Sequence, residues 1–131
     1  MKVVLANGCF DLLHPGHVEH LEEARAMGDY LLVGLTLDRA VGKAGRPIQT
    51  WEERAKMLRS LRCVSEVRGC VSALDALIRF KPDIFVKGAD YAESGLLPEE
   101  IAQCERSGIS IRFTKAQKRS TTDLIQRIRA E

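Results

Sequence analysis

Five short apolar runs alternate with segments of helical periodicity along this chain of 131 residues. Each run is nearly continuous in apolar side chains, as expected of strands that are buried on both faces. The expected strands cover residues 2–6, 30–37, 64–67, 83–86 and 109–113. This alternation predicts a five-stranded parallel sheet with helices on both faces, in one domain over residues 1–131. Because crossovers are right-handed, a doubly wound, Rossmann-like α/β arrangement is the simplest topology.

Start and stop signals mark the helices that connect these strands. Thr50 and Glu53 form a capping box, and Pro15 suits the first turn of a helix because a proline there loses no hydrogen bond. The expected boundaries are Pro15 and Gly28 for the first helix, Thr50 for the second, Ser72 and Pro82 for the third, Pro98 and Gly108 for the fourth, and Ser120 for the last. Two long irregular segments, Asp38–Gln49 and Gly88–Leu97, follow the ends of strands, where such sheets bind ligands.

Composition narrows the class of protein. A formal net charge of +2 gives no reason to expect nucleic acid or a membrane surface as a partner. No apolar run approaches the roughly 18 residues of a membrane span, and the first residues do not resemble a signal peptide, so we expect a cytoplasmic location. The four cysteines form no C-x-x-C pair, which argues against a zinc knuckle or a redox dithiol.

The stretch NGCFDLLHPGH joins the first strand to the first helix. Backbone N–H groups and the dipole at the start of that helix should form an anion site in the crevice of the sheet. Gly8 and Gly16 would let the backbone approach a ligand closely, and His14 and His17 would flank the site with imidazole donors. We expect phosphate recognition, with donors aimed at the charge that builds during phosphoryl or nucleotidyl transfer.

The third histidine, His20, has no partner in this motif and is expected to be structural. A zinc site made by all three histidines is an unfavourable alternative, because their spacing spreads them around the helix.

Two familiar nucleotide loops are excluded. The pattern G-x-G-x-x-G does not follow the first strand, and Gly42-Lys43-Ala44-Gly45 lacks the Walker spacing and its Ser/Thr. The string G-C-F-D-L-L-H-P-G-H instead resembles the cytidylyltransferase-like branch of the nucleotidylyltransferase superfamily. That branch includes glycerol-3-phosphate cytidylyltransferase, archaeal-type FAD synthetase and the adenylyltransferases that make ADP-heptose.

The resemblance implies a direct displacement, in which an acceptor phosphate attacks the α-phosphorus of a nucleoside triphosphate and pyrophosphate leaves. His14 and His17 would hold phosphate oxygens as the transition state forms, and Lys43 would cover the leaving pyrophosphate. Mg²⁺ would be held mainly by the nucleotide phosphates, without protein ligands. Asp11 is expected to brace the turn rather than to transfer protons. Gly42 and Gly45 suggest that the segment after the second strand is a mobile lid.

Further segments extend the resemblance along the chain. Val86-Lys87-Gly88-Ala89-Asp90-Tyr91 is similar to V-K-G-G-D-Y of the heptose enzymes, and Ser120-Thr121-Thr122 matches an S-T-T placed against nucleotide phosphates. Arg62-Cys63-Val64 stands where the glycerol-phosphate enzymes carry R-Y-V. The implied nucleotide contacts are Gly8, Cys9, Phe10, Gly16, Arg54, Lys87, Asp90, Ser120, Thr121 and Thr122. The implied substrate contacts are Asp11, Arg46, Arg62 and Tyr91.

Departures from the family patterns leave the acceptor open. Cys70-Val71-Ser72-Ala73 replaces the acidic segment ending in Thr-Pro of the heptose enzymes, and Lys118-Arg119 replaces Gly and an aromatic residue before S-T-T. The favoured function is transfer of AMP from ATP to a sugar 1-phosphate such as heptose 1-phosphate, by an enzyme that is a homodimer like many of this branch. The alternatives are a glycerol-3-phosphate cytidylyltransferase, an FAD synthetase-like enzyme and a nucleotide-binding module without turnover.

Overall fold

The computed structural model describes residues 1–91, 95–115 and 121–130, and it has one parallel sheet with the strand order β3-β2-β1-β4-β5. The strands are β1 (Val3–Gly8), β2 (Tyr30–Thr36), β3 (Glu66–Cys70), β4 (Ile84–Lys87) and β5 (Ser110–Phe113). The helices are α1 (Pro15–Arg25), α2 (Trp51–Arg59), α3 (Ala73–Phe80), α5 (Pro98–Ser107) and α6 (Thr121–Ala130), with a short 3-10 helix η1 (Asp38–Ala40). The predicted α/β class with a five-stranded parallel sheet is confirmed.

Two details of the sequence-based assignment are wrong. The third strand begins at Glu66 rather than near residue 64, because Val64 N–H donates to the carbonyl of Leu61 and continues the turn that follows α2. Pairing with β2 starts only where Ser65 N–H reaches the carbonyl of Leu31. The segment after β2, expected to be irregular, contains η1.

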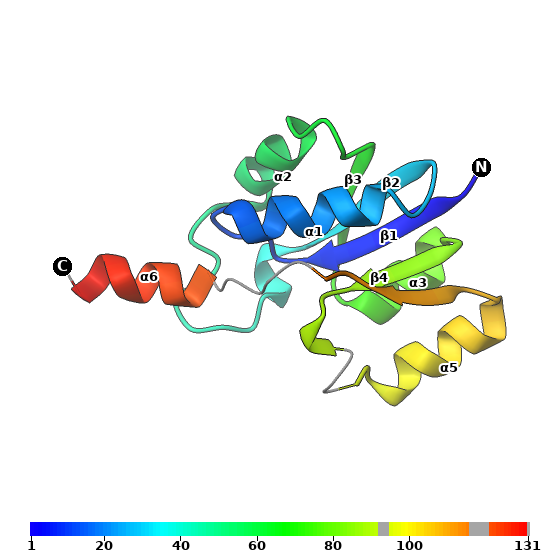
Figure 1. Cartoon of the computed structure of the whole chain (residues 1–131). Helices are drawn as coiled ribbons and strands as arrows, with labels where there is room; N and C mark the ends of the chain where they lie inside the picture. Colours follow the sequence, from blue (N-terminus) through cyan, green and yellow to red (C-terminus); the bar gives the residue numbers. More distant parts are fainter. Residues whose placement is uncertain (92–94, 116–120, 131) are drawn as a thin grey trace.

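Helices cover both faces of the sheet (Figure 1). One core lies between the sheet and helices α1 and α2, and it contains Leu21, Ala55 and Leu58, each fully buried. The second core lies against α3 and α5 and is centred on Leu5 and Phe85. Among the described residues, no helix has the length and apolar content needed to cross a membrane.

The strand order places a crevice beside the central strand. From β1 the chain crosses to β2 and β3 on one side, whereas β4 and β5 lie on the other, so the connections diverge between β1 and β4. A sheet of this kind binds ligands outside the carboxyl ends of its strands at such a switch point. The start of α1 and the ends of β4 and β5 meet at this edge.

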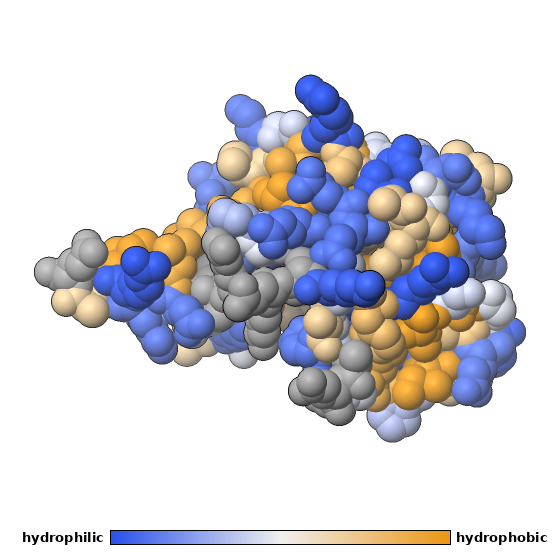
Figure 2. Space-filling view, viewed as in Figure 1, coloured by the Kyte–Doolittle hydropathy of each residue, from blue (hydrophilic) through white to orange (hydrophobic). Residues whose placement is uncertain are grey.

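Helix α6 extends away from the body of the sheet (Figure 1). Apolar side chains gather on it at the left edge of the space-filling view, and others gather over the region of β5 and α5 at lower right (Figure 2). The exposed apolar residues of these elements include Ile128 on α6, Ile101 on α5 and Phe113 on β5.

Candidate active site

A pocket of about 440 Å³ opens at the predicted edge of the sheet. It lies between the turn from β1 to α1, the segment after β2, and the segments that follow β4 and β5. Of the residues predicted from the sequence, the pocket is lined by Gly8, Cys9, Phe10, Asp11, Gly16, His17, Lys43, Arg46, Lys87, Asp90 and Tyr91. It is also lined by Asn7, His20, Thr36, Val86, Gly88, Ala89 and Thr114, which the sequence analysis did not assign to a site. The fold therefore brings most of the candidate residues into one cavity.

The two histidines of the motif form a stacked pair at the start of α1. Their ring centroids are 3.9 Å apart with an angle of 22° between the planes. His17 lines the pocket, where Phe10 packs edge-on against it, whereas His14 lies behind His17 and borders a groove between α1 and α2. His17 is therefore the ring that a ligand in the pocket meets first.

Hydrogen bonds fix which nitrogen of each ring carries the proton. Nδ1 of His14 accepts the N–H of Gly16 at 3.1 Å, and Nδ1 of His17 accepts the N–H of His14 at 3.3 Å. A neutral imidazole that accepts at Nδ1 carries its proton on Nε2. Both rings therefore carry their proton on Nε2. Of the two, His17 lines the pocket and can donate this N–H to a phosphate oxygen.

This capping corrects the expected anion site. The sequence predicted exposed N–H groups at the start of α1, but Gly16 N–H is bonded to His14 and His17 N–H donates to the carbonyl of His14 at 3.0 Å. Pro15 has no N–H to offer. The first turn of α1 thus contributes its dipole and the imidazoles, rather than free backbone donors, to anion binding.

The electrostatic surroundings keep His17 neutral. Burial first, and then the neighbouring His14 and His20, lower the pKa of His17 to about 4, against the opposing effect of Asp11. At neutral pH this ring is a hydrogen-bond donor without a positive charge. It can therefore stabilise charge that develops on a bound phosphate without acting as an acid in its resting state.

The backbone before α1 adopts uncommon conformations at residues with side chains. Phe10 and Leu12 have φ of +47° and +54°, in the left-handed region that glycine normally occupies. Gly8 also makes room for a neighbouring ring, since a Cβ there would lie 3.1 Å from Cε2 of Phe10. Both Gly8 and Phe10 line the pocket.

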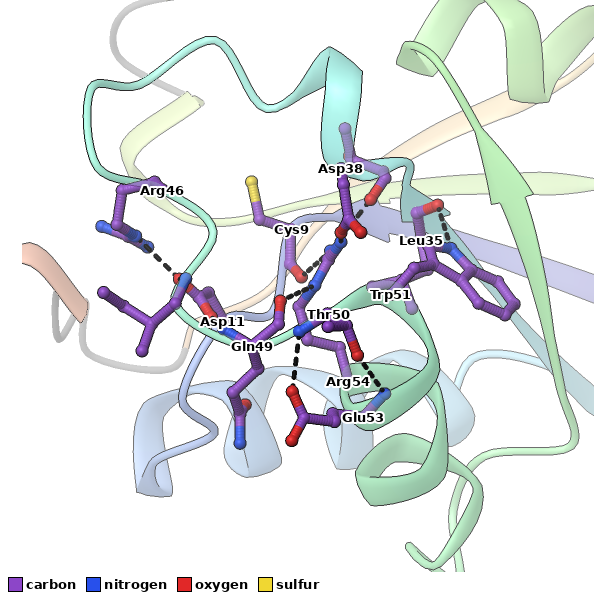
Figure 3. A network of polar contacts seen from close by, with 12 residues as sticks. Cys9, Asp11, Leu35, Asp38, Arg46, Gln49, Thr50, Trp51, Glu53 and Arg54 are labelled. Carbon is purple, nitrogen blue, oxygen red and sulfur yellow. Dashed lines mark hydrogen bonds and ion pairs between the residues drawn. The ribbon is translucent and has the colours of Figure 1, made fainter.

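Asp11 organises the segment after β2 (Figure 3). Its buried carboxylate accepts the N–H of Ile48 at 2.8 Å, the N–H of Gln49 at 3.0 Å and Nε of Arg46 at 2.8 Å. Burial alone raises the pKa of Asp11, but these hydrogen bonds outweigh burial and hold the pKa below its usual value. The carboxylate braces the turn, as predicted, and holds Arg46 at the pocket.

Arg54 corrects another expectation. The resemblance assigned it to the nucleotide, but its guanidinium is fully buried in the network of Figure 3. It donates to the carbonyls of Cys9 at 2.8 Å, Thr36 at 2.9 Å and Gln49 at 3.1 Å, and it forms an ion pair with Asp38. Arg54 thus ties the ends of β1 and β2 to the segment over them, and it does not line the pocket.

Lys87 carries the positive charge on the far side of the pocket. Its Nζ lies 3.4 Å from Oδ1 of Asn7 and 4.4 Å from the ring centroid of Tyr91. Burial lowers the pKa of Lys87, whereas the carboxylates of Glu100 and Asp90 oppose that change. With Lys43 and Arg46 on the opposite wall, cations border the pocket from both sides.

His20 belongs to the pocket, contrary to the expectation that it is only structural. It lies one turn after His17 on the same face of α1, and its Nδ1 is 2.7 Å from Oγ1 of Thr114. The spacing i, i+3 was the signal available in the sequence. Thr114 follows β5 by one residue and carried no motif, so only the fold reveals the pair.

The remaining predicted residues lie outside the pocket or outside the residues that the structure describes. Arg62 is exposed after the end of α2, at the edge of the sheet opposite the pocket, so the structure does not bring it to the site. Oγ1 of Thr122 accepts Nη1 of Arg46 at 3.3 Å, which connects α6 to the pocket wall. Ser120 lies outside the described residues, together with Lys118 and Arg119, and so does the side chain of Thr121.

The donor set does not form a protein-built metal centre. No group of three or more His, Cys, Asp or Glu side chains that could hold a metal ion occurs among the residues that the structure describes. The carboxylate nearest the motif, Asp11, already accepts from Arg46 and two backbone N–H groups.

The fold and the site define a class: a doubly wound α/β protein with an H-x-G-H turn and a cationic pocket at its switch point. Residues 5–127 match the family described as cytidylyltransferase-like, and the chain belongs to this family of nucleotidylyltransferase enzymes.

Relatives agree with this membership. The chain is 39% identical to the bifunctional protein HldE of Helicobacter pylori (strain J99 / ATCC 700824), over 98% of this chain and 28% of that protein. It is also 39% identical to the bifunctional protein HldE of Magnetococcus marinus, over 99% of this chain and 28% of that protein. The chain thus spans little more than a quarter of the length of these relatives. A lipopolysaccharide core biosynthesis protein from Thermoplasma volcanium GSS1 superimposes with a TM-score of 0.73 at 27% identity, over 92% of this chain and 99% of that one.

Proposed function

We propose that the chain transfers AMP from ATP to a sugar 1-phosphate, such as heptose 1-phosphate, and releases pyrophosphate. The observation that carries the proposal is the neutral His17 at the start of α1, set between cations on opposite walls of one pocket. Such a site can hold a chain of phosphates and stabilise charge that builds at the phosphorus between them.

The reaction needs no nucleophilic side chain. A phosphate oxygen of the acceptor attacks the α-phosphorus of ATP, the bond from that phosphorus to the bridging oxygen breaks, and pyrophosphate carries away the electron pair. His17 donates Nε2–H to an oxygen of the reacting phosphate, and His14 holds His17 in orientation by stacking and capping. Lys43 and Arg46 balance the charge of the leaving pyrophosphate. Mg²⁺ held by the nucleotide phosphates would supply further charge neutralisation.

The sugar acceptor rests on resemblance. V-K-G-A-D-Y at the end of β4 resembles the heptose group, its Lys87 and Asp90 line the pocket, and the relatives are named HldE. The match of Arg62-Cys63-Val64 to the glycerol-phosphate enzymes loses weight because Arg62 lies at the other edge of the sheet. ATP with heptose 1-phosphate is therefore favoured over CTP with glycerol 3-phosphate.

A crossed assay tests the proposal. ATP and CTP are each incubated with heptose 1-phosphate, glycerol 3-phosphate and FMN, and pyrophosphate release is measured. We expect turnover with ATP and heptose 1-phosphate. Turnover with CTP and glycerol 3-phosphate, or with ATP and FMN alone, would replace the proposed acceptor. Binding of ATP without pyrophosphate release from any pair would favour a nucleotide-binding module.

The proposal extends to assembly and location. We propose a homodimer in the cytoplasm, because enzymes of the branch that the sequence resembles are commonly homodimers and because ATP is a cytoplasmic substrate. Light scattering at working concentration measures the molar mass, and a monomer there would contradict the dimer without affecting the chemistry of the site.

A further inference from the structure

His20 lines the pocket beside His17 and reaches Thr114, the residue that follows β5. It follows His17 by three residues on α1, which corresponds to a rise of about 4.5 Å along the helix axis. If a reacting phosphate lies at His17, a group joined to that phosphate by a single ester linkage is close enough to reach His20. In both substrates of the proposed reaction that group is a sugar.

Thr114 holds the His20 ring in one orientation. Thr114 is 2% exposed, and its N–H donates to the carbonyl of Lys87 at 3.0 Å, which fixes it to β4. Its Oγ1 lies 2.7 Å from Nδ1 of His20. Whichever of the two groups donates, Nδ1 is occupied, and Nε2 is the nitrogen left for a ligand. The ring is therefore fixed by two elements that are far apart in the sequence.

The charge state of His20 favours a neutral ligand group. Burial lowers the pKa of His20, Lys87 lowers it further, and the carboxylates of Glu23 and Asp90 oppose them. A ring that is uncharged at neutral pH forms an ordinary hydrogen bond rather than an ion pair. A neutral ring of this kind binds a ligand that carries a hydroxyl more tightly than the same ligand without it. It has no positive charge with which to attract a second phosphate.

We propose that His20, positioned by Thr114, is a specificity-determining residue that hydrogen-bonds a sugar hydroxyl of the substrate. This inference rests on the proposed function, because the phosphate position at His17 defines what reaches His20. The sugar is either the ribose of the nucleotide or the acceptor sugar, since both are linked to a phosphate in the same way.

Calorimetric binding separates the two sources without requiring turnover. The wild-type protein and the variants Thr114→Val and His20→Gln are titrated with ATP, 2′-deoxy-ATP, 3′-deoxy-ATP and heptose 1-phosphate. Thr114→Val keeps the shape of the side chain but removes the hydroxyl that orients the ring. We expect the wild type to bind ATP roughly tenfold more tightly than either 2′-deoxy-ATP or 3′-deoxy-ATP, whichever lacks the hydroxyl that His20 binds. Both variants should lose that preference.

The other outcomes are equally defined. Unchanged nucleotide preference with roughly three- to tenfold weaker binding of heptose 1-phosphate would assign the hydroxyl to the acceptor. Equal weakening of every ligand, or no change in any, would overturn the role of His20. Glu19→Gln, an exposed change on the same helix, is the control and should bind all four ligands like the wild type.

A spectroscopic measurement guards against a purely structural effect. The ¹⁵N shifts of the His20 ring report its tautomer in the free wild type, and Thr114→Val should make the two tautomers interchange. Because the variant removes the partner of one buried nitrogen, which costs about 1–3 kcal/mol, the melting temperature should fall by no more than about 10 °C. A wild type that binds ATP with the expected preference but releases no pyrophosphate would overturn the proposed function and leave the inference on His20 standing.

Discussion

Replacing Asp11 by asparagine tests whether one buried carboxylate organises the site. The Asp11 side chain is 0% exposed, and it accepts two backbone N–H groups and Nε of Arg46. The asparagine side chain keeps the shape of the aspartate. However, it replaces one accepting oxygen by an NH₂ group, which then faces an N–H donor and cannot accept from it. A hydrogen bond to a charged group contributes about 1.5–3 kcal/mol, and an unsatisfied buried polar group costs about 1–3 kcal/mol. With partial relaxation, we expect the free energy of unfolding to fall by about 3 kcal/mol.

Thermal melting followed by circular dichroism measures this loss. Unfolding entropy is about 2.1 cal/mol/K per residue, so a change of about 3 kcal/mol in this chain lowers the melting temperature by about 10 °C. Asp29→Asn is a matched control, because Asp29 is exposed and accepts the N–H of Lys2 at 2.7 Å. The control should lose less than about 1 kcal/mol.

The decline in the free energy of unfolding at acid pH, the acid limb of the stability profile, gives a second test of Asp11. Its pKa is lowered in the folded protein, so its contribution is present above the unfolded pKa of about 3.9 and is lost as the pH falls through the lower folded value. Asp11→Asn should therefore flatten the decline of stability below about pH 4. The reasoning fails if Asp11→Asn is as stable as Asp29→Asn, or if its acid limb matches that of the wild type.

Three further predictions concern the pocket. His17→Ala should lower kcat for pyrophosphate release about 100-fold while ATP affinity changes much less, since the ring acts mainly in the transition state; normal turnover would remove its role. Lys43→Ala should lower kcat/KM and leave the melting temperature within about 2 °C of the wild type, because an exposed loop charge contributes little to folding. A large drop in melting temperature with retained activity would show that Lys43 is structural. The stability of the wild type should decline as the pH falls from about 6.5 to about 4, because the unfolded His17 binds a proton in that interval and the folded one, with a pKa of about 4, does not. His17→Phe should remove that part of the decline in urea unfolding, and an unchanged profile would contradict a buried, neutral His17.

Sequence patterns were sufficient for the elements because their signals are local. The capping box at Thr50 and Glu53 forms as predicted, with Thr50 Oγ1 accepting the N–H of Glu53 at 3.2 Å. Gly108 ends α5 in the left-handed conformation, at φ +70°. Buried apolar runs alternating with helices then left a parallel sheet covered on both faces as the simplest fold. The H-x-G-H turn could be placed at the ligand edge for the same reason.

Predictions from the sequence were wrong where contacts between distant segments determine the position of a side chain. The sequence suggested that Arg54 is available to bind phosphates. In the structure it is buried, and its guanidinium donates to carbonyls at the ends of two strands. Arg62 fitted a motif, yet the direction of α2 carries it to the opposite edge of the sheet. Spacing along the chain contains no information on either outcome, because both depend on where other strands end.

By itself the sequence determined the order of strands and helices, the class of fold and the turn that carries His14 and His17, because hydrophobic period, caps and turn residues act over a few positions. Only the tertiary structure decided that Asp11 binds Arg46 across 35 positions of sequence, and that Thr114 fixes His20 across 94 positions. A hydrogen bond needs two groups within about 3 Å with the right direction, and long-range packing of the sheet and its helices alone sets those distances.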